Sequence, residues 1–483
     1  MVTFLLCIAA LIVGYLVYGT FVEKVFSPNE ANRTPAMANP DGIDYVPISK
    51  PKAFLIQLLN IAGLGPIFGA ISGALWGPSV YLWIVGGTLL AGGVHDYLSG
   101  MLSVRNDGAS ITEITGKYLG HTMQNIMRVF GLVLLVMVGV VFMVGPAGLL
   151  ALLTPEWLNV KVWTIIILVY YFLATLLPVD KIIARLYPIF GIFLILMAVG
   201  VSIATMINSG TRPMMELTLE NLYPSAHQRP IWPLMFITVA CGAISGFHAT
   251  QSPIMSRCLK DERMGRPVFY GAMVAEGIIA LCWAAAGATF YDGTAGLGAA
   301  LKEAGPGGVV YEICNGFMGV VGIGGVSIGA VLAMLGVIAC PITSGDTAFR
   351  SARLTLADWL NIPQKEAPKR LLIAVPMLGI GLVLSQMDFS IIWRYFSWAN
   401  QTLAMITLWM GTAYLYLHKP GSYAYVVALV PAIFMSAVTT TYLMQAPEGF
   451  GLPTNITYPA GIGFAILFTA LFVRAFILRK RTL

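Results

Sequence analysis

Thirteen apolar stretches, each long enough to cross a lipid bilayer, constrain this chain more than any other feature of its sequence. One spanning helix needs about 20 mostly apolar residues. On that basis we place the spans near residues 2–20, 53–75, 79–102, 129–152, 162–178, 186–208, 232–254, 268–290, 315–340, 371–387, 390–417, 422–443 and 457–476. Charged residues make up 10% of the chain and hydrophobic residues 58%, against about 25% and 45–50% in soluble domains. The sequence therefore predicts an all-α polytopic membrane protein and excludes soluble enzymes and nucleic-acid-binding proteins.

The distribution of Lys and Arg predicts the orientation of these spans, because both residues concentrate in cytoplasmic loops. If the N-terminus lies outside, 23 of the 28 Lys and Arg fall in cytoplasmic loops, four fall in outer loops and Arg394 falls within a span. The prediction is therefore an N-terminus outside and a C-terminus in the cytoplasm. This placement also explains the net charge of +6. The first stretch has no basic residues before it and no obvious cleavage site, so we expect a retained span and not a signal peptide.

The second span is built from residues that disfavour a helix. It contains Gly63, Gly65 and Pro66. Pro66 has no N–H, and its ring collides with the carbonyl of Ala62, so that carbonyl loses its helical partner. A free carbonyl cannot face lipid and must meet protein, water, a substrate or a cation. We therefore expect a break at Gly63–Pro66, with a kink that binds nothing as the alternative. The later glycines of the span have the four-residue spacing of close helix packing.

The seventh span is interrupted in the same way, by Gly242, Gly246 and Pro253, and Pro253 would free the carbonyl of Ala249. Five spans separate the two interruptions, so the two spans run in opposite directions. Interrupted helices at matching positions of two halves indicate a secondary transporter with a binding site at the midplane. The predicted organisation is a peripheral helix and cytoplasmic loop, two inverted five-helix repeats, and two peripheral helices, over residues 1–52, 53–210, 232–417 and 418–483.

Candidate substrate-binding residues lie at these two interruptions, where unpaired backbone and polar side chains occur together. An alternative role for the glycines is helix packing alone. The candidates are Gly63, Gly65, Pro66, Ser245, Gly246, His248, Thr250 and Gln251.

Ionisable residues within spans are functional hypotheses by default. His95 and Asp96, near the cytoplasmic end of the third span, either relay protons or anchor the helix end. Glu276, in the middle of the eighth span, either couples transport to protons or is a neutral structural acid. His248 either recognises a substrate carboxylate or is a hydrogen-bonded core residue. Asn400, in the eleventh span, either lines a cavity or bonds a neighbouring helix.

The densest polar motif, CPITSGDTAFRSARL, occupies residues 340–354. Its Thr343, Ser344 and Asp346 offer oxygen ligands of the kind that hard cations use, so we expect a Na⁺ site that includes the freed carbonyl of Ala62. The alternative is that Ser344 or Asp346 is the N-cap of a cytoplasmic helix. The complete set of candidate ion-coupling residues is Ala62, His95, Asp96, Glu276, Thr343, Ser344 and Asp346.

The cysteines and the absence of enzyme motifs limit the chemistry further. No Cys-x-x-Cys pair occurs, so we expect neither a disulfide framework nor a thiolate metal site. The chain contains no P-loop, no G-x-G-x-x-G and no H-E-x-x-H, which predicts a protein that is not an enzyme and has no cofactor. The six cysteines are Cys7, Cys241, Cys258, Cys282, Cys314 and Cys340.

Several long motifs resemble the carbon-starvation protein (CstA) family, and the resemblance covers nearly the whole chain. They are IAGLGPIFGA, GGVHDYLSG followed by RNDGASITEITGKYLG, SGFHATQSP and ITSGDTAFRSARL, with NRTPAMANPDGIDYVP in the first loop. The resemblance implies uptake of peptides or pyruvate across the inner membrane of a prokaryote under carbon limitation, with proton coupling for pyruvate. It also implies kinship with transporters of the LeuT type, in which the third helix of the second repeat supplies hydroxyls to an ion; Thr343 and Ser344 match that position.

We therefore expect a secondary active transporter with a LeuT-like core that imports short peptides or a small carboxylate such as pyruvate by alternating access. Both substrates remain open at this point, as do H⁺ and Na⁺ as the coupling ion. The alternative is a nutrient-sensing membrane protein or a passive channel. The expected partners are the small-molecule substrate and the bilayer, with no nucleic acid, and no oligomeric state is predicted.

Overall fold

The computed structural model describes residues 1–483 except 43–44, 177–178, 240, 319–321, 324–325, 365 and 479–483. The side chains of residues 179–188, 318, 322–323, 326–330 and 332–333 are also outside the described part. Six of the basic side chains assigned to the cytoplasmic side therefore lie outside it, namely Lys181, Arg185, Lys365, Arg479, Lys480 and Arg481.

The described chain is almost entirely helical, as expected for thirteen apolar stretches. The first-half helices are α1 (Val2–Gly14), α2 (Thr20–Phe26), α3 (Pro35–Ala38), α4 (Lys50–Ile61), α5 (Ala70–Gly73), α6 (Ser79–Gly87), α7 (Gly93–Val104), α8 (Ile111–Leu119), α9 (His121–Leu153), α10 (Val160–Leu176) and α11 (Val179–Asn208). The second-half helices are α12 (Leu234–Thr238), α13 (Gly246–Ser256), α14 (Gly271–Phe290), α15 (Thr294–Met318), α16 (Ile328–Leu360), α17 (Ala367–Leu384), α18 (Phe389–His418), α19 (Val426–Gln445) and α20 (Thr454–Phe472). Short π and 3₁₀ segments extend several of them.

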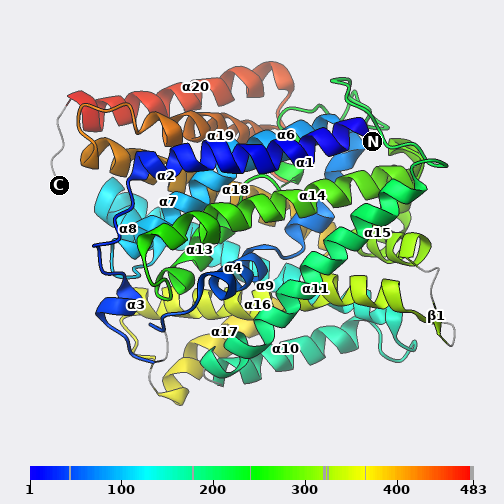
Figure 1. Cartoon of the computed structure of the whole chain (residues 1–483), viewed down its shortest axis with the longest axis horizontal. Helices are drawn as coiled ribbons and strands as arrows, with labels where there is room; N and C mark the ends of the chain where they lie inside the picture. The colour runs from blue at the N-terminus through cyan, green and yellow to red at the C-terminus, as the bar shows by residue number, and fades with distance from the viewer. Residues whose placement is uncertain are drawn as a thin grey trace.

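The long helices lie side by side along one axis (Figure 1). Helix α1 begins at the right-hand end of this axis in the view, the end at which β1 also lies. The pairing of β1 (Gly322–Ile323) with β2 (Val326–Ser327), which is antiparallel, is the only strand pair in the described part. The prediction of an all-α polytopic membrane protein is confirmed. Among the described residues, seven helices are long and apolar enough to cross a membrane, and the number is eight if the bent pair Lys50–Ile61 and Gly65–Trp76 is counted as one span. The count of thirteen, the repeats and the absolute orientation remain predictions.

The predicted bounds of the ninth span, 315–340, are wrong at the start, because the helix of the structure begins at Ile328. Residues 315–318 end α15, and the helix that follows the strand pair runs without interruption from Ile328 to Leu360. The motif at 340–354 therefore lies inside α16, and no helix starts at Ser344 or Asp346, so the alternative N-cap role for these residues is wrong. Pro341 lies within α16, and the helix continues past it although the proline removes one backbone hydrogen bond.

The first break occurs where the sequence predicts it. Helix α4 ends at Ile61, Ala62 leaves the helical region at φ −80° and ψ 72°, and a π-helical turn, Gly65–Gly69, resumes the span. The segments on the two sides are bent by 60°. Pro66 cannot supply the N–H that a continuous helix would give to Ala62, and this loss explains the position of the bend.

The second break lies earlier than predicted. Helix α12 ends at Thr238 and α13 begins at Gly246, so the interruption precedes Gly246, whereas Pro253 lies inside α13. Side chains of α18 stabilise this position. Gln401 Nε2 donates a hydrogen bond to the carbonyl of Phe236 at 2.6 Å, and Asn400 Oδ1 accepts one from the Phe247 N–H at 2.7 Å. A distant helix, and not the local proline, decides where the span breaks.

The two breaks pack directly against each other. A Cβ at Gly65 would overlap the side chain of Cys241, and a Cβ at Gly73 would overlap Val239. Glycine is therefore required for the approach of the first broken span to the second, which confirms the packing role expected for Gly73. The broken spans in turn contact α14 and α9, and these helices position the residues described below.

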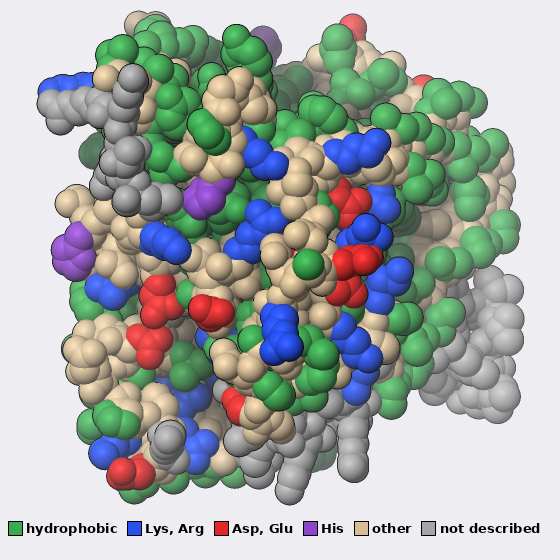
Figure 2. All heavy atoms as spheres, turned by 60° about the vertical axis from the view of Figure 1, so that its left-hand side comes forward, with side chains coloured by type: hydrophobic (Ala, Val, Ile, Leu, Met, Phe, Trp, Pro, Cys, Tyr) green, Lys and Arg blue, Asp and Glu red, His purple; other side chains and the backbone are tan. Residues whose placement is uncertain are grey.

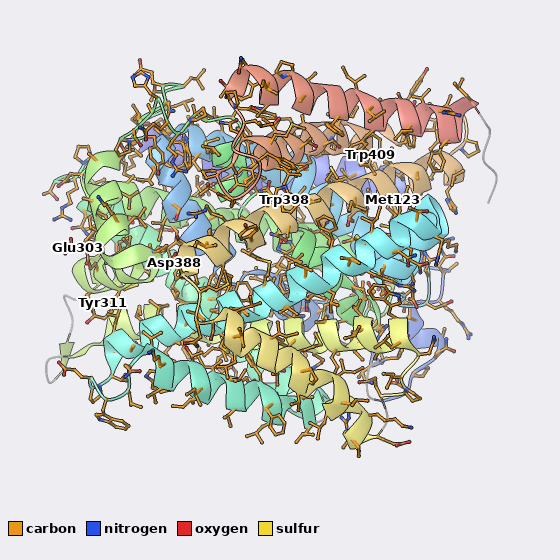
Figure 3. The ribbon with its side chains drawn as sticks, turned by 180° about the vertical axis from the view of Figure 1, so that it is seen from behind. Met123, Glu303, Tyr311, Asp388, Trp398 and Trp409 are labelled. Carbon is orange, nitrogen blue, oxygen red and sulfur yellow. The ribbon has the colours of Figure 1, made fainter. Side chains whose placement is uncertain are left out.

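Charged side chains gather at one end of the bundle. Figure 2 shows Lys, Arg, Asp and Glu on the face that turns forward from the left-hand side of Figure 1, with hydrophobic side chains beside them. The guanidinium of Arg105 contacts Glu262 at 2.9 Å between two loops that were assigned to the cytoplasm. From behind, Met123 of α9 lies toward one end, whereas Glu303 and Tyr311 of α15 lie at the other (Figure 3). Arg105 and Glu262, from two loops predicted to be cytoplasmic, therefore meet in the structure.

Candidate functional site

Four buried ionisable side chains contact one another in a row, beginning on α7 and passing through the helix that follows the second break. His95 Nδ1 is 2.7 Å from Asp96 Oδ1, and Asp96 Oδ2 is 2.8 Å from His248 Nδ1. The other ring nitrogen of His248, Nε2, is 3.2 Å from Glu276 Oε2. Helix α7 supplies the first two residues, α13 supplies His248 and α14 supplies Glu276. The structure thus brings together four residues that the sequence placed in three separate spans.

All four side chains are completely buried, with an exposed fraction of 0%. The contact between His248 and Glu276 has the distance of an ion pair without the geometry of a hydrogen bond, and both carboxylate oxygens of Glu276 lack a hydrogen-bond partner. Burying an unpaired charge is costly. This side chain is therefore either neutral or paired with a cation, and both states suit a coupling site.

Close packing brings α14 and α7 to the second break. Thr88 Oγ1, one turn before α7, donates a hydrogen bond to the carbonyl of Gly242 at 3.2 Å. A Cβ at Gly277 would collide with Thr88, and a Cβ at Gly92 would collide with the carbonyl of Ala243. The glycine beside Glu276 therefore allows the short distance across which its carboxylate reaches His248.

The sequence analysis missed Cys241 as a functional candidate. This cysteine lies within the second break, with its sulfur 3.5 Å from Ser245 Oγ and 3.4 Å from Asn400 Nδ2. Asn400 Oδ1 also accepts a hydrogen bond from Ser245 Oγ at 3.1 Å. The role of Asn400 in bonding a neighbouring helix is confirmed. A lone cysteine has no spacing partner in the sequence, so only its place in the glycine-rich ACGAISG segment could have identified it.

The predicted substrate-binding residues divide into two groups. Gly63, Gly65, Pro66, Ser245, Gly246 and His248 are buried around the paired breaks. Thr250 and Gln251 point elsewhere: Thr250 bonds the carbonyl of Phe247 at 2.6 Å and lines a separate cavity of about 30 Å³. Gln251 Nε2 donates to Thr250 Oγ1 at 3.0 Å. Helical geometry separates Thr250 from His248, because residues two apart do not share a helix face.

The hydroxyls of α16 meet the carbonyls that the first break exposes. Ser344 Oγ lies 3.0 Å from the carbonyl of Leu59, and the thiol of Cys340 donates to the carbonyl of Ala62. Thr343 Oγ1 lies 2.7 Å from the carbonyl of Cys340. Ser344 therefore reaches a carbonyl at the end of α4, whereas the predicted carbonyl of Ala62 is contacted by Cys340, so the Na⁺ site remains a prediction.

Asp346 does not join these oxygens. Its carboxylate is 3.4 Å from the guanidinium of Arg350, one turn further along α16. The guanidinium of Arg350 neutralises the charge of this carboxylate. Asp346 therefore forms an ion pair on its own helix and does not join Ser344 and Thr343 at the first break.

Comparison with known proteins identifies relatives along most of the chain. The model of the family described as carbon starvation protein CstA matches residues 1–156, 153–296 and 295–442. An uncharacterized membrane protein of Haemophilus influenzae is 44% identical, covering 60% of this chain and 92% of that protein. A peptide transporter CstA of Campylobacter jejuni is 29% identical over 56% of this chain, and the pyruvate/proton symporter BtsT of Escherichia coli is 27% identical over 57%. The chain covers 47% of the length of each of these two transporters.

The fold is shared with solved transporter structures. A manganese transporter of Eremococcus coleocola superposes with a TM-score of 0.54 at 12% identity, over 90% of this chain and 97% of that one. MhsT in complex with L-phenylalanine superposes with a TM-score of 0.53 at 14% identity, over 87% of this chain and 98% of that one. The expected kinship with transporters of the LeuT fold is thereby confirmed at the level of the fold.

Proposed function

The chain belongs to the carbon starvation protein CstA family, and from that premise we propose that it is a secondary active transporter that imports a small carboxylate or a short peptide. An inward proton gradient drives the uptake, and alternating access moves the substrate across the membrane. The names of two relatives, a peptide transporter and a pyruvate/proton symporter, support this choice of substrates and ion.

The observation that carries the proposal is the junction of two broken spans with a buried ionisable chain behind them. A broken span exposes backbone groups to a ligand. His248 lies on α13, directly after the second break, and contacts Asp96 on α7 and Glu276 on α14. His248 thus connects the second break to the carboxylates of Asp96 and Glu276. A substrate that moves α13 would therefore also change the affinity of these carboxylates for a proton.

The start of α13 is the proposed contact for the substrate carboxylate. The amino end of a helix carries a partial positive charge and unpaired N–H groups, which favour an anion. Asn400 Oδ1 occupies the Phe247 N–H in this structure, so an incoming carboxylate would replace a side-chain amide. Pyruvate and the carboxyl terminus of a peptide both present a carboxylate that the amino end of α13 could bind. Both are therefore included as substrates.

Sodium coupling is the second candidate, and a separate observation favours it. Ser344 Oγ lies 3.0 Å from the carbonyl of Leu59, just before the first break, and it shares the carbonyl of Cys340 with Thr343 Oγ1. Hydroxyl and carbonyl oxygens are suitable ligands for a hard cation. In the structure the hydroxyl protons are donated to carbonyls, so a cation at this position would require those hydroxyls to rotate.

The test is uptake into proteoliposomes that contain the purified full chain. Labelled pyruvate and a labelled dipeptide are each offered with an imposed proton gradient, with a sodium gradient, and with neither. Accumulation above the outside concentration under the proton gradient, abolished by a protonophore, is the expected result. Uptake that only equilibrates and ignores both gradients would indicate a channel, and binding without uptake would indicate a sensor. A response to sodium alone would move the coupling site to α16.

A further inference from the structure

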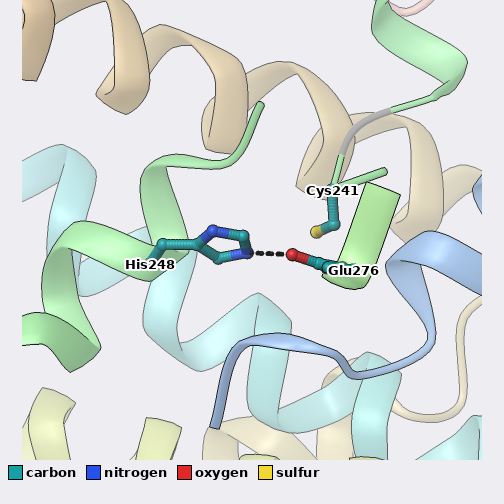
Figure 4. Close-up of side chains that lie close together, drawn as sticks. All are labelled: Cys241, His248 and Glu276. Carbon is teal, nitrogen blue, oxygen red and sulfur yellow. Dashed lines mark ion pairs between the residues drawn. The ribbon is translucent and has the colours of Figure 1, made fainter. Parts of the chain in front are cut away.

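A sulfur, a nitrogen and a carboxylate converge beside the second break. The Cys241 thiol, His248 Nε2 and a Glu276 oxygen all lie within 4.8 Å of one another, and all three residues are buried (Figure 4). They come from the break itself, from α13 and from α14. Their positions in the sequence share no recognisable metal-binding spacing, so the cluster exists only in the folded chain.

The orientation of His248 leaves its Nε2 available to a ligand. An ionised carboxylate oxygen only accepts hydrogen bonds, so His248 Nδ1 carries the proton in the 2.8 Å contact with Asp96. In the neutral ring, Nε2 then has a free lone pair, and it has no hydrogen-bond partner. In many metal sites, a carboxylate accepts the N–H of one ring nitrogen and thereby turns the other nitrogen toward the metal. Asp96 and His248 have this arrangement, with Nε2 directed at Cys241 and Glu276.

Two further ligand atoms are similarly available. Neither oxygen of Glu276 has a hydrogen-bond partner, although the residue is fully buried. The sulfur of Cys241 accepts a hydrogen bond from Asn400 Nδ2 at 3.4 Å and lies 3.5 Å from Ser245 Oγ, and it keeps a lone pair that a metal can use. Buried polar atoms without a hydrogen-bond partner require an explanation, and a bound cation would supply one for His248 Nε2 and for the Glu276 carboxylate.

We propose that Cys241, His248 and Glu276 form a binding site for one divalent transition-metal ion of the zinc class. Thiolate, imidazole and carboxylate are the ligands that zinc uses, with bond lengths of about 2.0–2.3 Å, which place tetrahedral ligands about 3.5 Å apart. His248 Nε2 and Glu276 Oε2 are already 3.2 Å apart, and the other separations, of at most 4.8 Å, have to shorten toward the spacing of tetrahedral ligands when a metal binds. A thiolate excludes the alkali and alkaline-earth cations, which select oxygen. Three protein ligands leave a fourth position for water.

Binding has a defined proton balance and a mechanical consequence. The thiol of Cys241 loses its proton to solvent as the metal–sulfur bond forms, since the thiolate is the ligand. The metal then joins the second break to α13 and α14. Resting on the proposed transport function, this crosslink would also hold the broken span in place, so zinc would inhibit uptake.

The decisive experiment measures metal binding by the purified full chain in detergent, without substrate or gradient. Protein treated with a chelator is titrated with Co²⁺, which reports a thiolate ligand by its charge-transfer absorption, and bound Zn²⁺ is counted by elemental analysis after desalting. We expect one ion per chain and a thiolate band. Cys241→Ser should lose the band, whereas Cys282→Ser, which alters a buried cysteine of α14 outside the cluster, should keep it. Asp96→Asn should keep the band with about 10–100-fold weaker binding.

A measurement on the unaltered chain covers the case in which Cys241→Ser does not fold. The protein is unfolded after a brief alkylation with and without Zn²⁺, and peptide mass spectrometry reports which of the six cysteines reacted. Protection by Zn²⁺ that is confined to Cys241 supports the site. No thiolate band in the unaltered chain, a band that persists in Cys241→Ser, or protection at a different cysteine would overturn it. Because none of these measurements involves uptake, a failure of the transport proposal would be seen separately.

Discussion

The contact between Asp96 and His248 is the link between the second break and the rest of the buried chain, and replacing Asp96 by Asn tests it. Asn has nearly the same shape and keeps one acceptor oxygen. It therefore retains one of the two contacts that the carboxylate makes, at 2.7 Å to His95 and 2.8 Å to His248. The exposed Asp107, in the turn that follows α7, provides the matched control Asp107→Asn.

The magnitude follows from the number and type of hydrogen bonds lost. A hydrogen bond to a charged group contributes about 1.5–3 kcal/mol, so Asp96→Asn should lower the free energy of unfolding by about that amount. Asp107→Asn should change it by less than about 0.5 kcal/mol. The assay is unfolding in mixed micelles, followed by helical content, on protein that refolds when the denaturing detergent is diluted.

A double-mutant cycle with His248→Gln separates the contact from general damage to the core. If Asp96 and His248 interact as the geometry indicates, the two changes should be non-additive by about 1.5–3 kcal/mol, because removing either partner removes the same bond. Effects that add within about 0.5 kcal/mol would show that the residues do not interact. That result would refute the assignment of a connected chain, whatever the effect of either single change.

Three further predictions address the breaks and the two cation sites. Gly65→Ala should destabilise the protein by about 1–3 kcal/mol through overlap with the side chain opposite, whereas Gly86→Ala, where a Cβ meets nothing within 4 Å, should not; equal thermal denaturation profiles for the two would contradict the packing of the breaks. Glu276→Gln should remove the stimulation of uptake by a proton gradient while substrate exchange without a gradient continues, and an unchanged response would exclude Glu276 from coupling. Thr343→Ala with Ser344→Ala should leave proton-driven uptake intact and remove any sodium dependence; full retention of a sodium response would exclude the α16 hydroxyls.

Much of the fold could be predicted from local chemistry. The lost N–H of Pro66 acts on a carbonyl only four residues away, so the sequence alone located the first break next to Ala62. The apolar stretches predicted an almost wholly helical chain. These inferences succeed because each depends on residues that are neighbours in the chain, whereas the sidedness inferred from Lys and Arg stays a prediction.

The same local reasoning was wrong at the second break and in α16. Pro253 lies within α13 because the break is stabilised from α18, by Asn400 and Gln401. The proline of the 340–354 motif does not end its helix either. At the second break, contacts with residues far away in the sequence outweigh the preference of the proline.

The candidate site was predictable as a set of residues and not as an arrangement. The expense of burying an ionisable group identified His95, Asp96, His248 and Glu276 from the sequence alone. The sequence could not reveal that Asp96 and His248, which are 152 positions apart, share a hydrogen bond, or that Cys241 lies beside them. Composition and local backbone chemistry determined that this chain forms a helical membrane protein with interrupted spans. Only the packing of those spans decided which buried groups face each other, because the distance between side chains on different helices depends on all the contacts that hold those helices together.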